Sequence, residues 1–295
     1  MVEEASGREY FRALTDANSW IVCVSNSTNQ NQFYKLARQL LEGGVRVPAL
    51  FSISDDQKLS IQEDFGEDCL LNNSTPYSQE IMRQTLHQLS LMQKLSINNL
   101  ALLEPKHLIE QASLMQSVFL KNFLDLPIDQ NLYRLLRNIV DGLANQPQVN
   151  CHFDFERRNL FLLANHEVGI IDFQDLKVGP IGIDLAGYCV DHYLSVDSQR
   201  ITNCCKIFLD FNSCNLGEAE LVEMVLMAAL QRNARILGVL SNLYLEQQRS
   251  FRLPDLEQIL KNFIDILSLL NLGSFNVLLD ALERTPKVVT KICKQ

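Results

Sequence analysis

The spacing of hydrophobic and polar positions changes near residue 70, and this change predicts two structural regions. Before it, short apolar runs alternate with polar turns, and the two runs around the turn TDAN predict a β-hairpin. Between these strands and two later ones, a segment with the helical period ends at Gly43 and Gly44. The predicted order is strand, strand, helix, strand, strand over 10–14, 20–24, 33–42, 47–53 and 58–66.

Helical periodicity dominates the rest of the chain. Helices are predicted over 76–96, 105–126, 130–145, 182–194, 198–212, 217–245, 254–271 and 274–284. Two apolar runs, 160–163 and 168–171, are joined by the turn ANHE and predict the only strands of this region, a tight hairpin. The sequence therefore predicts an α+β protein with a small antiparallel-sheet lobe, 1–68, and a large helical lobe, 69–295.

Composition narrows the classes of partner. The chain has 295 residues, of which 47% are hydrophobic, so it can bury a large core. A net charge of −9 without a Lys/Arg-rich run argues against a nucleic-acid partner. The most apolar segment, 263–282, contains two Asp and two Asn, which predicts a buried helix pair and no membrane partner. Eight scattered cysteines and an N-terminus unlike a signal peptide predict reduced thiols in a cytoplasmic protein. The oligomeric state is not predicted.

One stretch, HFDFERRNLFLLANHEVGIIDFQD, carries candidate chemistry. Asn159 follows Asp154 by five residues, and Asp172 comes at the end of the second strand of the predicted hairpin. Phosphoryl transfer needs a carboxylate near the acceptor hydroxyl and oxygen ligands that hold magnesium on the phosphates. Protein kinases provide them with HRDxxxxN followed by DFG. Here the hairpin would return Asp172 to Asn159, so that both could share a metal ion.

This pattern has to be weighed against chance. A single DxxxxN is more often a loop with ordinary polar residues, because short motifs have many false positives. Here HxDxxxxN, an apolar strand, a turn, a second apolar strand and DFQD occur in the order that a kinase-like site requires. We therefore interpret the stretch as a kinase-like site.

Several segments carry a family resemblance. CHFDFERRNLFLL and GIIDFQDLKVGPIGIDLAGYCVD resemble the catalytic loop and the following segment of the aminoglycoside phosphotransferase / choline kinase superfamily, which has a protein-kinase-like two-lobe fold. SGREYFRAL, IQEDFGED and LQRNARILGVL are similar to segments of the bacterial anomeric N-acetylmuramate/N-acetylglucosamine kinases in that superfamily. The resemblance implies ATP and Mg2+ as cofactors, with the nucleotide bound by the small lobe, 1–68, and the catalytic loop and acceptor site carried by the large lobe, 69–295. It also implies phosphorylation of a small-molecule acceptor, the anomeric hydroxyl of an amino sugar in cell-wall recycling.

The resemblance also assigns roles to residues of the loop. It implies that Asp154 is the catalytic base or the carboxylate that orients the acceptor hydroxyl, and that Asn159 and Asp172 bind magnesium. It further implies that Asp184 holds the catalytic loop, with His152 as structural support. Asp154, Asn159 and Asp172 fit the reaction that the whole superfamily shares.

Other residues are candidates for binding the acceptor. Glu156 and Asp175 lie next to the catalytic and metal-binding positions and could contact sugar hydroxyls, with solvated loop positions as the alternative. Arg232 could pair with a substrate carboxylate, although an exposed or salt-bridged helix position explains it as well.

The chain departs from the family pattern at the catalytic loop and at the phosphates. Phe153 stands where the family usually has Arg, and the pair Glu156 and Arg157 replaces His-Ser, so the acceptor can differ from the usual one. The strand SWIVCVS lacks the lysine that protein and aminoglycoside kinases use for the ATP phosphates. Arg8 or Arg12 could supply that charge, or both could be surface residues.

Three functions therefore compete. The leading one is an ATP- and Mg2+-dependent kinase of an amino sugar. The second is a kinase of an aminoglycoside or another small alcohol. The third is a degenerate kinase fold that acts as a binding protein, which the missing lysine favours and the intact Asp154, Asn159 and Asp172 oppose.

Overall fold

The computed structural model describes residues 8–16, 18–25, 30–56, 58–212 and 215–294. It divides into two compact units, and each unit is built from two stretches of chain. The first consists of Met1–Leu100 and Asp154–Leu176, and the second of Ala101–Phe153 and Lys177–Gln295. This division differs from the predicted lobes, 1–68 and 69–295, because residues 69–100 and 154–176 pack within the first unit.

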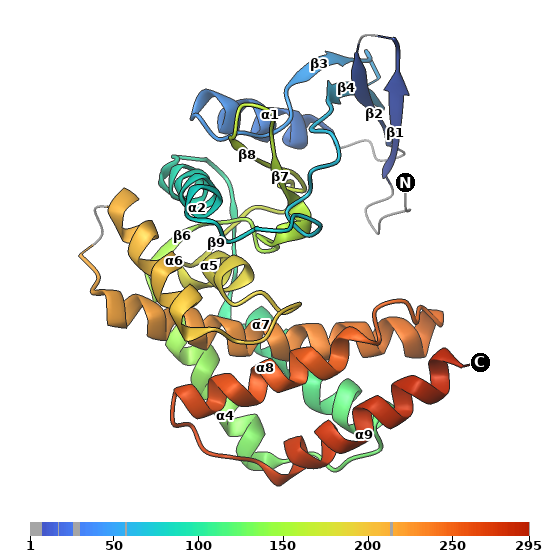
Figure 1. Cartoon of the computed structure of the whole chain (residues 1–295), viewed down its shortest axis with the longest axis vertical. Coiled ribbons are helices and arrows are strands. Elements are labelled where there is room, and N and C mark those ends of the chain that lie inside the picture. The colour runs from blue at the N-terminus through green and yellow to red at the C-terminus, as the bar shows by residue number, and fades with distance from the viewer. Residues whose placement is uncertain (1–7, 17, 26–29, 57, 213–214, 295) are drawn as a thin grey trace. The chain divides into compact units, whose positions relative to one another are not determined.

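The first unit contains a four-stranded antiparallel sheet in the order β1-β2-β4-β3. The predicted hairpin is confirmed, with β1 (Arg8–Leu14) paired to β2 (Ser19–Ser25), and the helix α1 (Gln30–Glu42) follows it (Figure 1). The remaining strands, β3 (Leu50–Ile53) and β4 (Leu59–Glu63), complete the predicted order. One face of the sheet is buried, because Cys23, Ser60 and Gln62 are at most 6% exposed.

The same unit holds a helix and a short hairpin. Ser78 caps α2 (Gln79–Lys94), since its hydroxyl accepts a hydrogen bond from Ile81 N. β7 (Leu160–Leu162) pairs antiparallel with β8 (Val168–Ile170), as the sequence predicted, and β8 contacts α2. Backbone hydrogen bonds from Leu70 N to Leu160 O and from Ile170 N to Arg46 O, both 2.8 Å, fix this hairpin within the unit.

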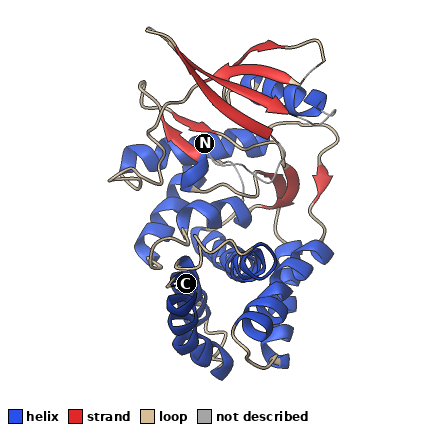
Figure 2. Cartoon of the chain, turned by 90° about the vertical axis from the view of Figure 1, so that its right-hand side faces the viewer, coloured by secondary structure: helices blue, strands red, loops and turns tan. Residues whose placement is uncertain are grey.

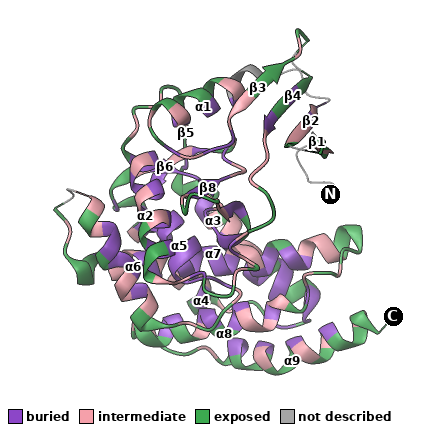
Figure 3. Cartoon of the chain, turned by 45° about the horizontal axis from the view of Figure 1, so that its top comes forward, coloured by how far each residue is buried: buried purple, intermediate pink, exposed green. Residues whose placement is uncertain are grey.

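Helices make up most of the second unit (Figure 2). Their bounds are α3 (Pro105–Leu114), α4 (Gln130–Ala144), α5 (Gly182–Cys189), α6 (Ser198–Phe211), α7 (Glu218–Gln247), α8 (Asp255–Leu269) and α9 (Asn276–Cys293). The long helix α7 contacts α3, α4, α5, α6 and α8; α5 is buried along its whole length, and the buried residues of α7 lie between 221 and 241 (Figure 3). α7 approaches Leu114 closely at Gly238, where a Cβ atom would lie 2.6 Å from the Leu114 carbonyl carbon.

Three features of this unit differ from the prediction. A small sheet of β5 (Ala101–Leu102), β6 (Gln148–Cys151) and β9 (Lys177–Pro180) is present, so the expectation of only two strands after residue 68 is wrong. These strands have two to four residues, too few for a period of two to be visible in the sequence.

The other two differences concern helices. The helix predicted over 105–126 continues beyond α3 as a π-helix, Met115–Phe123. α9 passes the predicted end at 284 and continues through Pro286, because a proline removes one helical hydrogen bond without forcing the helix to end. No helix in the described ranges is long and apolar enough to cross a membrane.

Candidate active site

The loop after β6 brings Asn159 to Asp154. The loop closes with the 3-10 turn Arg157–Asn159, in which Asn159 N donates to Glu156 O at 2.9 Å. The side-chain amide of Asn159 donates to the backbone carbonyl of Asp154, also at 2.9 Å. Asn159 is 6% exposed, so its amide is held in one orientation by the loop it closes. Its nitrogen is used in this contact, and its carbonyl oxygen Oδ1 is left as an acceptor.

The hairpin returns Asp172 to the same place. Ile171 N donates to Asn159 O at 3.0 Å, so the residue just before Asp172 is bonded to the other predicted metal ligand. Asp172 has a left-handed backbone, with φ of 63°, which is uncommon for a residue other than glycine. Its Oδ1 accepts a hydrogen bond from the side chain of Gln174. Asp154, Asn159 and Asp172 all belong to the first unit.

These residues fit a magnesium ion. Mg2+ prefers oxygen ligands and is usually bound by one or two carboxylates together with waters and substrate phosphates. Asn159 Oδ1 and the second carboxylate oxygen of Asp172 have no hydrogen-bond partner among the described residues. Nor do three or more His, Cys, Asp or Glu side chains form a metal-binding group in the ranges that the structure describes. This arrangement suits a metal that needs substrate oxygens to complete its coordination.

In the second unit, Asp184 holds the residues that lead to Asp154. Its carboxylate is fully buried on α5 and accepts from His152 N at 2.6 Å and from Phe153 N at 2.8 Å. Burial raises the pKa of Asp184, and His152 and the two amide hydrogen bonds oppose that rise. His152 is itself 1% exposed. The structure thus brings Asp184 and His152 together, and their role in supporting a catalytic loop stays a prediction.

Arg232 lies in the same network. It is 4% exposed on α7, and its Nη1 donates to the carbonyl oxygen of Phe153 at 3.3 Å. Its charge also lowers the pKa of Asp184. The assignment of Arg232 to a substrate carboxylate stays a prediction, because here its guanidinium contacts the catalytic loop.

A cavity of about 270 Å3 lies within the first unit, next to Asp172. Its lining combines the sheet residues Tyr10, Arg12, Ile21 and Gln62, the aromatic side chains of Phe33, Phe65, Phe161 and Phe173, and also Pro48, Glu63, Asp64, Gly66, Ile171, Asp172 and Gln174. The backbone N–H and C=O of Phe65 have no hydrogen-bond partner among the described residues. A flat, hydrogen-bonding aromatic ligand matches such walls.

Arg12 is the cation in the lining of this cavity. Its Nε pairs with Asp64 at 2.7 Å, its Nη1 pairs with Glu67 at 2.8 Å, and its Nη2 donates to Gly66 O at 2.9 Å. Two carboxylates therefore surround one guanidinium, and the charge of the cluster is negative. Arg8 is the first residue of β1, and its side chain lies outside the described part of the chain. The assignment of Arg8 and Arg12 to the phosphates stays a prediction.

The two acidic candidates for the acceptor have different surroundings. Glu156 is 2% exposed, and its carboxylate pairs with Arg158. Asp175 is exposed and has no hydrogen-bond or ion-pair partner among the described residues. Asp175 is therefore open to a ligand, whereas Glu156 is engaged inside the loop. Substrate contacts of both residues stay predictions.

Sequence reasoning missed the role of Arg157. Its buried guanidinium donates to Leu70 O and Leu71 O, each at 3.3 Å, and lies over the ring of Tyr77. Cys69 Sγ in turn donates to Arg157 O at 3.3 Å. The contacts connect the catalytic loop to residues 69–77 of the same unit. Nothing in the sequence signalled that Arg157 is buried, because the partners of its guanidinium are backbone carbonyls far away in the sequence.

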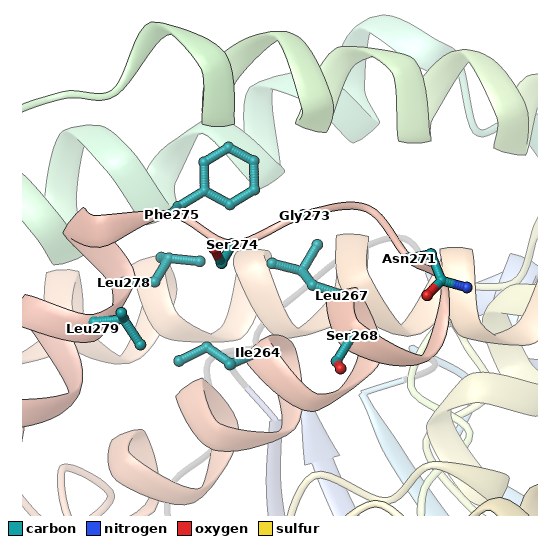
Figure 4. A pocket seen from close by; sticks show the side chains of 9 residues that line it. All are labelled: Ile264, Leu267, Ser268, Asn271, Gly273, Ser274, Phe275, Leu278 and Leu279. Atoms are coloured by element: carbon teal, nitrogen blue, oxygen red, sulfur yellow. The ribbon is translucent and has the colours of Figure 1, made fainter.

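A second cavity, of about 480 Å3, lies in the C-terminal helices (Figure 4). Its lining comes from α8, α9 and the turn between them, and consists of Ile264, Leu267, Ser268, Asn271, Gly273, Ser274, Phe275, Leu278 and Leu279. None of these side chains is titratable, so this cavity offers no acid, base or metal ligand for phosphoryl transfer.

Comparisons with known proteins identify the family of the chain. The model of the phosphotransferase enzyme family matches residues 2–201. The N-acetylmuramate/N-acetylglucosamine kinase of Pseudomonas aeruginosa is 26% identical over 206 residues, which is 67% of this chain and 61% of that protein. The match thus spans less than two thirds of that relative's length.

Two solved structures share the fold. A choline/ethanolamine kinase family protein from Mesorhizobium loti superimposes with a TM-score of 0.61 at 11% identity, over 93% of this chain and 92% of that one. The AMP-bound spectinomycin phosphotransferase superimposes with a TM-score of 0.60 at 14% identity, over 92% of this chain and 90% of that one. The chain therefore belongs to the phosphotransferase enzyme family, and the predicted superfamily and protein-kinase-like fold class are confirmed.

Proposed function

We propose that the protein transfers a phosphoryl group from ATP, with Mg2+, to a hydroxyl of a small molecule. The observation that carries this proposal is the pair of hydrogen bonds that joins Asn159 to Asp154 and to Ile171, the residue before Asp172, beside the cavity that Asp172 lines. A bound magnesium would screen the charge of the phosphates. Asn159 and Asp172 would hold that ion, and Asp154 would orient the acceptor hydroxyl and accept its proton.

The cavity of about 270 Å3 suits the nucleotide. Its aromatic side chains offer flat apolar walls for a purine ring, and the open N–H and C=O of Phe65 offer one donor and one acceptor to its edge. The AMP-bound state of the structurally similar spectinomycin phosphotransferase supports a nucleotide as the ligand.

For the acceptor, we favour an amino sugar of the N-acetylmuramate/N-acetylglucosamine type, phosphorylated at its anomeric hydroxyl in cell-wall recycling. The similarity to the Pseudomonas aeruginosa kinase supports this choice. Asp175, three residues after Asp172, is exposed and has no partner among the described residues, so it is open to sugar hydroxyls. The free thiols of the described cysteines support the reducing cytoplasm as the place of action.

The alternative of a binding protein without activity rests on the missing lysine. Arg46 does not replace it, because Glu63 and Glu167 pair with its guanidinium. Arg12 already pairs with Asp64 and Glu67, so no cation among the described residues of the first unit is assigned to the phosphates. The fit of Asn159 and Asp172 to magnesium opposes this alternative, since the ion itself can supply positive charge.

A screen of acceptors tests the proposal. Release of ADP would be measured with ATP, Mg2+ and, in turn, N-acetylmuramate, N-acetylglucosamine, an aminoglycoside and choline. We expect turnover with at least one of the two amino sugars, and none when Mg2+ is omitted. Turnover with the aminoglycoside or choline alone would replace the acceptor assignment. Absence of turnover with all four, together with no thermal shift by millimolar ATP and Mg2+, would contradict the proposal.

A further inference from the structure

Phe153 is the residue directly before Asp154, and it has a strained backbone. Its φ is 75°, in the left-handed region that bulky side chains adopt only when their surroundings hold them there. A conformation of this kind at the position next to the proposed catalytic base raises the question of what holds it. The contacts that hold this conformation lie in the second unit.

Both peptide groups of Phe153 are held by charged side chains. Its N–H donates to Asp184 Oδ1 at 2.8 Å, and its carbonyl oxygen accepts from Arg232 Nη1 at 3.3 Å. Each peptide group is planar, so the only soft torsions between these two groups are φ and ψ of Phe153. The plane that contains the Phe153 carbonyl also contains the nitrogen and Cα of Asp154. Fixing both planes therefore fixes the direction in which the chain enters Asp154.

The ring of Phe153 is held as well. The guanidinium of Arg235 lies 4.6 Å from the ring centroid, and the ammonium of Lys177 lies 5.7 Å from it. Both distances are within the range of attraction between a cation and an aromatic face. Among the described residues, Lys177 has no ion-pair partner, and its contact with an aromatic group is the one with this ring.

Three elements that are distant in sequence thus meet at one residue, Phe153, through its backbone and its ring. Lys177 begins β9, Asp184 lies on α5, and Arg232 and Arg235 lie three residues apart on α7. We propose that Phe153 is a positioning residue, whose ring, held by Lys177 and Arg235, keeps the left-handed turn that directs Asp154 toward the acceptor. This inference rests on the proposed function and adds to it a residue that sets the geometry of the base.

The test replaces the ring while keeping apolar bulk. Phe153→Leu should lower kcat by about 10- to 100-fold, because displacing a catalytic group by about 1 Å can cost about 100-fold. The KM for ATP should stay within twofold, since Phe153 does not line the cavity proposed for the nucleotide. Phe153→Tyr keeps the aromatic face and should retain kcat within threefold. Phe251→Leu, at a phenylalanine that is 74% exposed, is the matched control and should behave as wild type.

A second variant leaves Phe153 in place. Arg235→Met removes the charge above the ring and should lower kcat in the same direction. In the double variant with Phe153→Leu, the two losses should not add, because the charge and the ring act through one contact. If Phe153→Leu does not fold, Arg235→Met and Phe153→Tyr carry the test. A kcat within twofold of wild type in Phe153→Leu or Arg235→Met would overturn the proposal, as would a parallel loss of nucleotide affinity.

Rates of amide hydrogen exchange test this inference independently of the proposed function. In the wild type, the amides of His152 and Phe153 should exchange slowly, because Asp184 accepts both and is buried. Phe153→Leu should accelerate both, whereas Phe251→Leu should not. If the wild type phosphorylates no acceptor, the proposed function fails, and the exchange rates still decide whether the ring holds the turn. Unchanged exchange in Phe153→Leu would overturn the inference even in an active enzyme.

Discussion

The side-chain amide of Asn159 donates to the backbone carbonyl of Asp154 at 2.9 Å, which links the proposed metal ligand to the proposed base. The two residues are five positions apart, and the hydrogen bond closes the loop between them. Because Ile171 N also donates to Asn159 O, Asp172 joins the same bonded group. The geometry of the group is therefore set by the backbone of one compact unit, before any ligand is bound.

The first prediction concerns Asp172. Millimolar ATP with Mg2+ should raise the Tm of the wild type, because a ligand that binds only the folded state stabilises it. Asp172→Ala should abolish this shift, since the variant loses a carboxylate that holds the ion on the phosphates. Asp265→Ala removes an exposed carboxylate of α8 and should leave the shift unchanged. An undiminished shift in Asp172→Ala, measured by thermal scanning, would show that Asp172 does not take part in nucleotide binding.

The second prediction separates two roles of Arg12. If Arg12 serves the phosphates, Arg12→Met should weaken the binding of ATP much more than that of adenosine, and Arg12→Lys should restore part of the difference. If its pairing with Asp64 and Glu67 only shapes the cavity, both ligands should weaken equally. Titration calorimetry with ATP and with adenosine measures the two losses of affinity and hence their ratio. The structure favours the second outcome, because two carboxylates already neutralise the guanidinium.

The third prediction concerns Asp184. Asp184→Asn places an NH2 group where one of two backbone amides now donates, so one buried hydrogen bond is lost and two donors face each other. Hydrogen bonds to charged groups contribute about 1.5–3 kcal/mol, so we expect the free energy of unfolding to fall by about that amount. Urea denaturation gives the value. A fall in the free energy of unfolding of less than about 0.5 kcal/mol would contradict a stabilising role of the buried hydrogen bonds that the carboxylate accepts.

The fourth prediction concerns pH. The hydrogen bond from Arg46 holds the pKa of Glu63 below its ordinary value of 4.5. A carboxyl group whose pKa is lower in the folded state contributes stability above the ordinary value, and that stability is lost as the pH falls through the lower one. Glu63→Gln should therefore be less stable than wild type at pH 7, and the difference should shrink below pH 4.5.

Urea denaturation of both proteins between pH 7 and pH 3 gives this difference. Glu257→Gln is the control, because the pair of Glu257 with Lys261 is a surface i,i+4 contact of the kind that contributes little. A gap between wild type and Glu63→Gln that is constant over this range would mean that Arg46 does not stabilise the carboxylate form of Glu63.

The sequence predicted what local patterns encode. The hairpin of 160–163 and 168–171 followed from apolar runs and a turn, and its consequence, the return of Asp172 to Asn159, is confirmed in the structure. The spacing of Asp154 and Asn159 carried equally local information. The predicted helices are confirmed over most of their lengths, because each has a periodic apolar face.

What the sequence could not predict depends on contacts between distant residues. Arg12 meets Asp64 across 52 positions, and Arg232 meets Phe153 across 79, so no local pattern announces either pair. β6 and β9 are short strands whose pairing is decided by register rather than by periodicity. The left-handed backbone of Phe153 is likewise set by α5 and α7 and not by a preference of phenylalanine.

Asp154→Asn tests the central claim most directly, by comparing turnover with nucleotide affinity in one variant. Removing a general base costs about 100- to 10,000-fold in rate, so kcat for the acceptor should fall by at least 100-fold. The affinity for ATP with Mg2+, measured by calorimetry, should stay within twofold, because the base acts on the acceptor and not on the nucleotide. Retained turnover in Asp154→Asn, or loss of ATP binding together with turnover, would contradict the account.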